Sequence, residues 1–465
     1  MSAARRATPG TLLATVALVA SGGARAAGQR AELAQAIDAY IAPYVETNNF
    51  SGQLLVMRGG TAVYERELSW ANRAAGARMT RETELHIASI SMQFTAAAIM
   101  RLVDRHALTL DTRVSDLVPN VRGGDAITIR NLLEQRSGLS DINSRADYAE
   151  ILARHQTPTS LVAVVADDTL LFPTGTRYLH EEHSAYNLLA LIIEKKSGLP
   201  FAEAMQTLVF RPTGMAHSGA DDDGSARGRS LAQGYDPKGV YGLDTTTPIH
   251  WSAKSGNASV YSTAGDEARW VRQLFHGTFL SAGSHALIAD SGGVPVGYGW
   301  FRRQNMRFGE LAFSMNGRAP GFASCVMYLP REDLTVVAFS NIYSSATTDI
   351  GNDVAAIVLG LPYTPLALGA HALSPDSLGL DGATFTFPHD FYQPDATVGF
   401  RVTNGELFLA WPSGERSPII PIDRDHAVDR AYWEPVSVTR DSAGRATSIT
   451  YDRFRGERAV FRDAL

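Results

Sequence analysis

The spacing of apolar residues changes along the N-terminal part of the chain and predicts both helices and strands. Apolar residues recur with helical spacing over residues 31–44 and again from Ser89 to Val103. Between these segments, residues 52–57 and 61–64 are rich in β-forming side chains on either side of Gly59-Gly60. Two such runs joined by a glycine turn are typical of a β-hairpin.

A mostly helical region follows, and strands return after it. Residues 129–133 and 186–194 have helical spacing, whereas residues 297–301, 323–329 and 334–339 form runs of strand length. Helices placed between an N-terminal hairpin and C-terminal strands fit an α+β sandwich.

The end of the chain has a different pattern. Residues 361–375 are rich in Pro, Leu, Ala and Gly and predict a linker. Short alternating strands such as 397–403 and 446–451 then indicate a small all-β unit. The predicted division is a signal peptide at 1–27, a main domain at 28–360, a linker at 361–376 and a β-rich domain at 377–465.

The N-terminus predicts export. Arg5 and Arg6 precede the apolar run Leu12–Ala20, and Ala24-Arg25-Ala26 matches a cleavage site. The run is too short to span a bilayer, so we expect no transmembrane segment. The expected location is the periplasm or outside the cell.

Composition excludes several classes of function. The chain has 465 residues, 45% of them apolar, and a net charge of −6, so there is no bulk electrostatic case for binding nucleic acid or an anionic membrane. The single cysteine, Cys325, excludes an intrachain disulfide framework and a multi-cysteine metal site. We expect Cys325 to lie in a buried strand, and we expect no cofactor.

The segment Leu85–Ile99 resembles the nucleophile helix of the serine β-lactamase and penicillin-binding-protein superfamily. That superfamily uses a Ser-x-x-Lys motif, in which the lysine lies one helical turn after the serine and takes its proton. The resemblance covers roughly residues 52–360. Its matching segments are the Ser89 helix and residues 132–141, 172–175, 186–198, 211–215, 260–266 and 320–330.

This resemblance implies a fold and a reaction class. The fold is α+β, with an antiparallel sheet flanked by helices and an inserted helical region. Related proteins are class C β-lactamases, DD-peptidases and esterases, many of which carry a small β-barrel-like C-terminal domain. The implied chemistry is hydrolysis or acyl transfer on a small-molecule or peptide-like substrate through Ser89.

The three catalytic motifs that the resemblance implies are all altered. Ser89 matches the nucleophile, but Met92 stands at the lysine position, and His86 stands at an arginine-like position before the serine. Aligning the Tyr-x-Asn motif on Tyr186 puts Glu181 at the tyrosine and His183 at the asparagine. In the strand motif that normally begins with His or Lys, the local sequence is Met315-Asn316-Gly317.

Acyl transfer at Ser89 still requires a base and an oxyanion hole. In the family the oxyanion hole uses the N–H of the serine and one from the strand that carries Gly317. A neutral histidine is a good base near pH 7, so Ser89, His183 and a glutamate would act as a triad. Other residues expected at the cleft are His86, Met92, His180, Glu182, Met315 and Asn316.

Two alternatives remain open at this point. The Glu181/His183 cluster would also suit direct proton transfer in an isomerase, lyase or cyclase, with Ser89 only hydrogen-bonding the substrate. The loss of three catalytic groups would also fit an inactive binding module. The sequence does not determine the oligomeric state.

Two further features have ordinary interpretations. His180, Glu181, Glu182 and His183 lack the H-E-x-x-H spacing, so we expect no metal site. Lys254 lies in a segment that often borders the cleft in this family, but a surface position is the default for a lysine.

Overall fold

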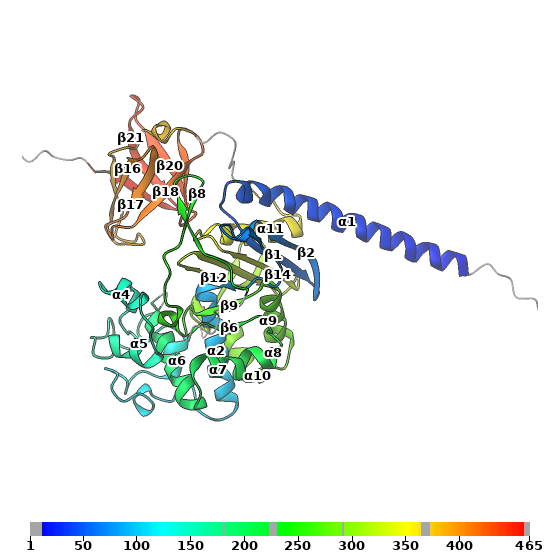
Figure 1. Cartoon of the computed structure of the whole chain (residues 1–465), viewed down its shortest axis with the longest axis vertical. Helices are drawn as coiled ribbons and strands as arrows, with labels where there is room; N and C mark the ends of the chain where they lie inside the picture. The colour runs from blue at the N-terminus through cyan, green and yellow to red at the C-terminus, as the bar shows by residue number, and fades with distance from the viewer. Residues whose placement is uncertain (1–11, 180–181, 223–229, 291–292, 364–372, 460–465) are drawn as a thin grey trace, which may run out of the picture.

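A seven-stranded antiparallel sheet forms the centre of the main domain in the computed structural model, which describes residues 12–179, 182–222, 230–290, 293–363 and 373–459 (Figure 1). The strand order is β10-β11-β12-β13-β14-β1-β2. The bounds are β1 (Gly52–Arg58), β2 (Thr61–Leu68), β10 (Val296–Gly297), β11 (Trp300–Asn305), β12 (Glu310–Ala319), β13 (Phe322–Leu329) and β14 (Leu334–Ser340).

The predicted hairpin and the late strands meet in this sheet. β1 pairs antiparallel with β14, so that Leu54 lies opposite Ala338 although they are far apart in the sequence. The strand β14 is buried along its whole length. Its alternating side chains belong to two cores, because Val336 is in the same buried cluster as Ile350 and Val337 is in the same buried cluster as Trp270.

Helices cover both faces of the sheet. The helices α1 (Leu12–Glu46) and α11 (Ala346–Leu359) pack together, and α11 lies against β13 and β14. On the opposite face, α9 (Ala264–His276) contacts β1 and β14. A strand buried on both faces needs a largely apolar sequence, which explains why most residues of β13 and β14 are apolar.

A helical region extends from the sheet around α2 (Ser91–Asp104), most of whose residues are buried. The short helix η1 (Ala88–Ile90) leads into α2, and η5 (Trp251–Lys254) lies in a later loop. The other helices are α3 (Ile129–Leu133), α4 (Tyr148–Leu152), α5 (Pro158–Val165), α6 (His183–Ser197), α7 (Phe201–Met205), α8 (Arg211–Thr213) and α10 (Ala282–Asp290). Short strands are β3 (Trp70–Asn72), β4 (Ala77–Arg78), β5 (Leu85–His86), β6 (Gly219–Ala220), β7 (Tyr235–Lys238), β8 (Gly242–Thr245) and β9 (Val260–Ser262).

A closed barrel made of β15 to β22 follows the main domain. Neighbouring strands are antiparallel, and β15 pairs with β22 to close the ring. Its interior is filled by apolar and aromatic side chains such as Phe385, Phe400 and Tyr451. The bounds are β15 (Thr384–Thr386), β16 (Thr397–Thr403), β17 (Glu406–Ala410), β18 (Arg416–Pro421), β19 (His426–Asp429), β20 (Pro435–Arg440), β21 (Ala446–Tyr451) and β22 (Phe454–Arg458).

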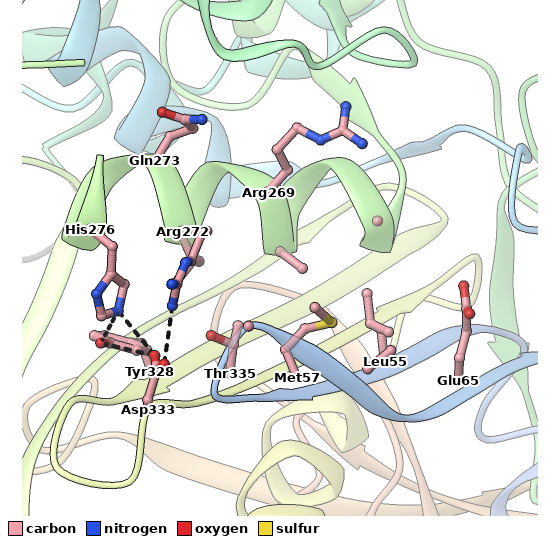
Figure 2. A pocket seen from close by; sticks show the side chains of 15 residues that line it. Leu55, Met57, Glu65, Arg269, Arg272, Gln273, His276, Tyr328, Asp333 and Thr335 are labelled. Carbon is pink, nitrogen blue, oxygen red and sulfur yellow. Dashed lines mark hydrogen bonds and ion pairs between the residues drawn. The ribbon is translucent and has the colours of Figure 1, made fainter. Parts of the chain in front are cut away.

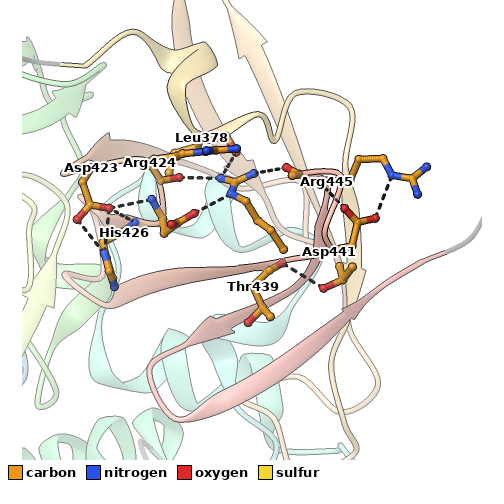
Figure 3. Close-up of polar contacts among 11 residues, drawn as sticks. Leu378, Asp423, Arg424, His426, Thr439, Asp441 and Arg445 are labelled. Atoms are coloured by element: carbon orange, nitrogen blue, oxygen red, sulfur yellow. Dashed lines mark hydrogen bonds and ion pairs between the residues drawn. The ribbon is translucent and has the colours of Figure 1, made fainter.

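Polar contacts hold one end of the barrel together (Figure 3). The Arg440 guanidinium donates to Asp425 at 2.6 Å and to the Leu378 carbonyl at 2.9 Å. Arg445 pairs with Asp441 at 3.0 Å in the following turn. Arg440 therefore ties β20 to the segment through which the chain enters the barrel.

The barrel packs against the main domain. Val428 and Trp433 belong to the same buried cluster as Tyr44 and Ile350. The structure confirms the predicted fold class, namely an antiparallel sheet with helices and a β-rich C-terminal unit. Within the described ranges, no helix has both the length and the apolar character that crossing a membrane requires. The predicted signal peptide falls partly on residues 1–11, outside those ranges, and stays a prediction.

Candidate functional site

Ser89 lies in the tight turn that precedes α2. It is one of the three residues of η1, and 7% of its surface is exposed. The preceding residue, Ala88, has a φ of 51°, a left-handed conformation that costs a non-glycine residue about 1–3 kcal/mol. Such strain persists only when the surrounding structure imposes it, and it is concentrated at functional sites.

The strand β12 passes directly beside Ser89. A Cβ atom on Gly317 would lie 2.6 Å from the Ser89 nitrogen, so only glycine fits there. On the adjoining strand, the Ser324 hydroxyl donates to the Ile87 carbonyl at 2.6 Å and fixes the turn to the sheet. The predicted close approach of the Gly317 strand to Ser89 is therefore present, whereas the oxyanion hole at the Ser89 N–H stays a prediction.

Ser89 opens into a cleft of about 490 Å³. Polar side chains from several elements line it, and one aromatic side chain comes from the barrel. The described lining residues include Ser89, Asn143, Tyr148, His183, Lys254, Asn257, Asn316, Gly317, Arg318, Tyr343 and Tyr432.

His183 lies in this cleft together with a carboxylate partner. It is the first residue of α6, and 8% of its surface is exposed. Its Nδ1 atom lies 3.1 Å from Asp141 Oδ1 and 3.1 Å from the Asn143 amide nitrogen. The Asp141 carboxylate only accepts hydrogen bonds, so the tautomer with a proton on Nδ1 satisfies this contact and leaves Nε2 unprotonated. In that tautomer the Asn143 N–H group cannot donate to Nδ1. The orienting group is thus Asp141, whereas the sequence suggested a glutamate.

Lys254 is a cleft residue that the sequence analysis assigned to the surface by default. Only 7% of it is exposed, and its ammonium group donates to the Tyr148 hydroxyl. Burial is the main reason that the pKa of Tyr148 is raised, followed by the charge of Asp141, so the hydroxyl stays protonated. Nearby, Asn257 is 1% exposed, and within the described part of the chain neither polar atom of its amide has a hydrogen-bond partner.

The loop with Lys254 and Asn257 is fixed to two helices. Thr95 of α2 donates to the Gly256 carbonyl at 2.7 Å, and Asn187 of α6 donates to the Ser255 carbonyl at 2.7 Å. A weak signal for this arrangement was present in the sequence, because the segment with Lys254 was expected near the cleft. The burial of Lys254 could not be predicted from the sequence, because it depends on these long-range contacts.

The two methionines at the altered motifs are core residues. Met92 is 1% exposed, Met315 is 3% exposed, and both belong to the main buried cluster. Neither is among the described residues that line the Ser89 cleft, whereas the neighbouring Asn316 and Gly317 are. The structure corrects the expectation that these methionines face the substrate, because both side chains pack inward.

His86 and Glu182 are also placed in the interior. His86 stacks on Trp251 with ring centroids 3.6 Å apart, and burial lowers its pKa to about 3. The Glu182 carboxylate accepts hydrogen bonds from the backbone N–H groups of Ser137 and Gly138 at 3.2 and 2.9 Å. Burial raises the pKa of Glu182 to about 7. These contacts keep both side chains from the described cleft lining, contrary to expectation.

His180 and Glu181 lie outside the described residues. Their expected roles, as a cleft residue and as a candidate base, therefore stay predictions. Among the residues that the structure describes, no group of three or more His, Cys, Asp or Glu side chains is placed to hold a metal ion.

A second hollow, of about 360 Å³, lies between α9 and the sheet, away from Ser89 (Figure 2). Four of its polar side chains contact one another. His276 Nε2 lies 2.8 Å from the Tyr328 hydroxyl, and Arg272 pairs with Asp333 at 3.0 Å. The cleft at Ser89 is therefore the better candidate for chemistry, since it combines a serine, a histidine and an amide that has no hydrogen-bond partner among the described residues.

The chain is similar in sequence to several known proteins. The chain is 26% identical over 309 residues to the penicillin-binding protein PbpX of Bacillus subtilis (strain 168), covering 66% of this chain and 74% of that protein. It is 24% identical over 445 residues to penicillin-binding protein 4* of the same organism, covering 89% and 96%. D-aminopeptidases and an esterase are further relatives.

A solved structure shares the fold over most of the chain. The octameric penicillin-binding protein homologue from Pyrococcus abyssi aligns with a TM-score of 0.62 and 21% identity, covering 91% of this chain and 99% of that one. The β-lactamase family model matches residues 37–360, well over half of the chain. The chain therefore belongs to the β-lactamase family, which includes penicillin-binding proteins, D-aminopeptidases and esterases.

Proposed function

We propose that the protein is a serine hydrolase or acyltransferase whose nucleophile is Ser89 and whose base is His183. The observation that carries this proposal is that Ser89 and His183 line one cleft, with Asp141 Oδ1 3.1 Å from His183 Nδ1. The proposed substrate is a small amide, ester or peptide-like molecule. The proposed location is the periplasm or the outside of the cell, on the basis of the N-terminal sequence.

The proposed reaction begins with attack of Ser89 Oγ on the acyl carbon. His183 Nε2 takes the hydroxyl proton, and Asp141 stabilises the imidazolium through Nδ1–H. The Ser89 N–H and an amide of β12 stabilise the oxyanion. The proton then passes from His183 to the leaving group as the bond to the acyl carbon breaks. Water or an acceptor alcohol or amine, deprotonated by His183, releases the acyl group and restores Ser89.

The retained geometry around Ser89 supports this proposal. Ala88 keeps a strained left-handed conformation, and Gly317 keeps the close approach of β12. A protonated Tyr148 hydroxyl, held by Lys254, offers a donor to the substrate, and Asn257 offers both a donor and an acceptor. These groups fit a substrate with an amide or ester beside the scissile bond.

Labelling with a fluorophosphonate tests the proposal. We expect one adduct on Ser89 in the full-length protein, located by peptide mass mapping, and none in Ser89→Ala. His183→Ala should slow labelling on the order of 10²-fold, as loss of a general base does. His389→Ala, at an exposed barrel position, is the matched control and should label normally.

Two results would contradict the proposal. An absence of adduct on Ser89 would favour an inactive binding module, an outcome consistent with the two buried methionines. Normal labelling of His183→Ala would show that another group is the base.

A further inference from the structure

A turn of the C-terminal barrel reaches the Ser89 cleft. The turn joins β19 to β20 and contains Arg430, Ala431 and Tyr432. The Tyr432 side chain is among those that line the cleft, together with Ser89 and Arg318. The wall of the cleft is therefore composite, since one part of it comes from the barrel.

Arg430 anchors this turn in the main domain. Its side chain is fully buried, and its Nε donates to Asn49 Oδ1 at 2.8 Å. Its Nη1 donates to the carbonyls of Gly239 and Gly242 in the β7–β8 hairpin at 2.6 and 2.8 Å. Figure 1 shows β8 beside the barrel. A buried guanidinium satisfied by several main-chain acceptors leaves the turn little freedom to move.

The next two residues continue the attachment. The Ala431 carbonyl accepts hydrogen bonds from the Ser345 N–H at 3.0 Å and from Arg318 Nη1 at 2.9 Å. The Arg318 guanidinium lies 3.8 Å from the Tyr432 ring centroid and 4.3 Å from that of Tyr343. Arg318 thus contacts two aromatic rings, one from each domain.

Arg318 directly follows Gly317, the residue of β12 that approaches the Ser89 nitrogen. The Tyr432 ring is held from its other end, because its hydroxyl donates to Glu415 at 2.8 Å. The ring therefore does two things at once. It forms part of the cleft wall, and it contacts the side chain of Arg318, the neighbour of Gly317 on β12.

We propose that Tyr432 of the barrel is a specificity-determining residue that limits the size of the group that reaches Ser89. This inference deepens the proposed function, because it rests on Ser89 as the reacting residue. On this basis the barrel is part of the substrate site, and removal of the Tyr432 ring should admit bulkier groups.

A thiol at position 89 tests directly how large a group can reach this position, because its reaction with a thiol probe requires no catalytic base. Cys325 is buried, so Ser89→Cys supplies one accessible thiol in the full-length chain, with the unsubstituted chain as baseline. The probes are methyl methanethiosulfonate and benzyl methanethiosulfonate, and mass spectrometry follows both rates. The ratio of the benzyl rate to the methyl rate measures size selection.

We expect Tyr432→Ala, in the Ser89→Cys background, to raise this ratio about tenfold, in the range by which a pocket wall discriminates between groups of different size. Tyr432→Phe keeps the ring and should leave the ratio unchanged. Tyr392→Ala, a more exposed tyrosine of the same barrel, is the matched control and should also leave it unchanged. General loosening of the fold would raise both rates together and leave the ratio as it was.

An unchanged ratio in Tyr432→Ala would overturn the inference. If that variant fails to fold, Tyr432→Leu replaces it. A raised ratio in Tyr432→Leu would then support the inference, and an unchanged ratio would overturn it. Fluorophosphonate labelling of the unsubstituted chain is a separate measurement. Its failure would count against the proposed function, while the thiol ratio would still report on Tyr432.

Discussion

At the scale of single residues, side chains that are adjacent in an altered motif have different surroundings. Asn316 and Gly317 line the cleft, whereas Met315 packs into the core beside them. Met92 is likewise enclosed by apolar neighbours. Apolar core residues, Met92 and Met315, therefore stand at the positions of the family's basic groups. His183 is the candidate base in their place.

Met92→Lys should destabilise the protein and should not restore a faster nucleophile. An ammonium placed in this core without a partner should cost about 3 kcal/mol or more in the free energy of unfolding. Met92→Leu conserves volume and should cost less than about 1.5 kcal/mol. Urea denaturation followed by tryptophan fluorescence compares the two. Equal stability together with faster fluorophosphonate labelling of Met92→Lys would contradict this prediction.

At the scale of elements, the site depends on the contact of α2 with the loop that carries Lys254 and Asn257. The hydroxyl of Thr95, a fully buried residue one turn beyond Met92, donates to the Gly256 carbonyl. Gly256 itself has a φ of 87° and lies against the Tyr186 carbonyl, where a Cβ atom would be only 2.2 Å away. One hydrogen bond therefore joins the nucleophile helix to the polar side of the cleft.

Thr95→Val tests this connection. The change conserves shape but leaves the buried Gly256 carbonyl without its donor, which should cost about 1–3 kcal/mol. Displacement of the loop should also slow labelling of Ser89. Thr95→Ser keeps the hydroxyl and is the control for both measurements. Identical stability and labelling in the valine and serine variants would show that the bond does not hold the loop.

At the scale of the whole molecule, several carboxyl groups are buried with raised pKa values. Burial raises the pKa of Glu182 to about 7, of Glu434 to about 7 and of Glu267 to about 8. Glu267 is fully buried, and among the described residues its carboxyl oxygens have no hydrogen-bond partner. In the folded state these groups hold protons that the unfolded chain has already lost.

Stability should therefore fall as the pH rises from about 5 to 8. Each such group stabilises the fold below its unfolded pKa, and that contribution is lost as the pH passes through the folded pKa. Glu267→Gln removes one titrating proton and should flatten the slope by up to about 1.4 kcal/mol per pH unit. Thermal unfolding at several pH values measures this slope of stability against pH. Glu203→Gln, at an exposed position, should leave the slope unchanged, and an unchanged slope in Glu267→Gln would refute the assignment.

Patterning along the chain was sufficient to predict several helices and strands and to propose Ser89 as the nucleophile. The β1–β2 hairpin, the apolar strands β13 and β14 and the alternating strands of the barrel all follow local rules of side-chain spacing. Ser89 was found from a local motif, and His183 was found from its register with Tyr186. These features depend on residues that are close together in the sequence, where periodicity and motif spacing carry information.

Tertiary packing placed the remaining groups. Glu182 and His183 are neighbours in the sequence, yet the start of α6 puts one carboxylate in the core and the next side chain in the cleft. Lys254 and Tyr432 reach the same cleft from a loop and from the barrel, and Asp141 contacts His183 from a further loop. No local sequence pattern predicts these contacts, because burial and contact between distant segments arise only when the whole chain has packed.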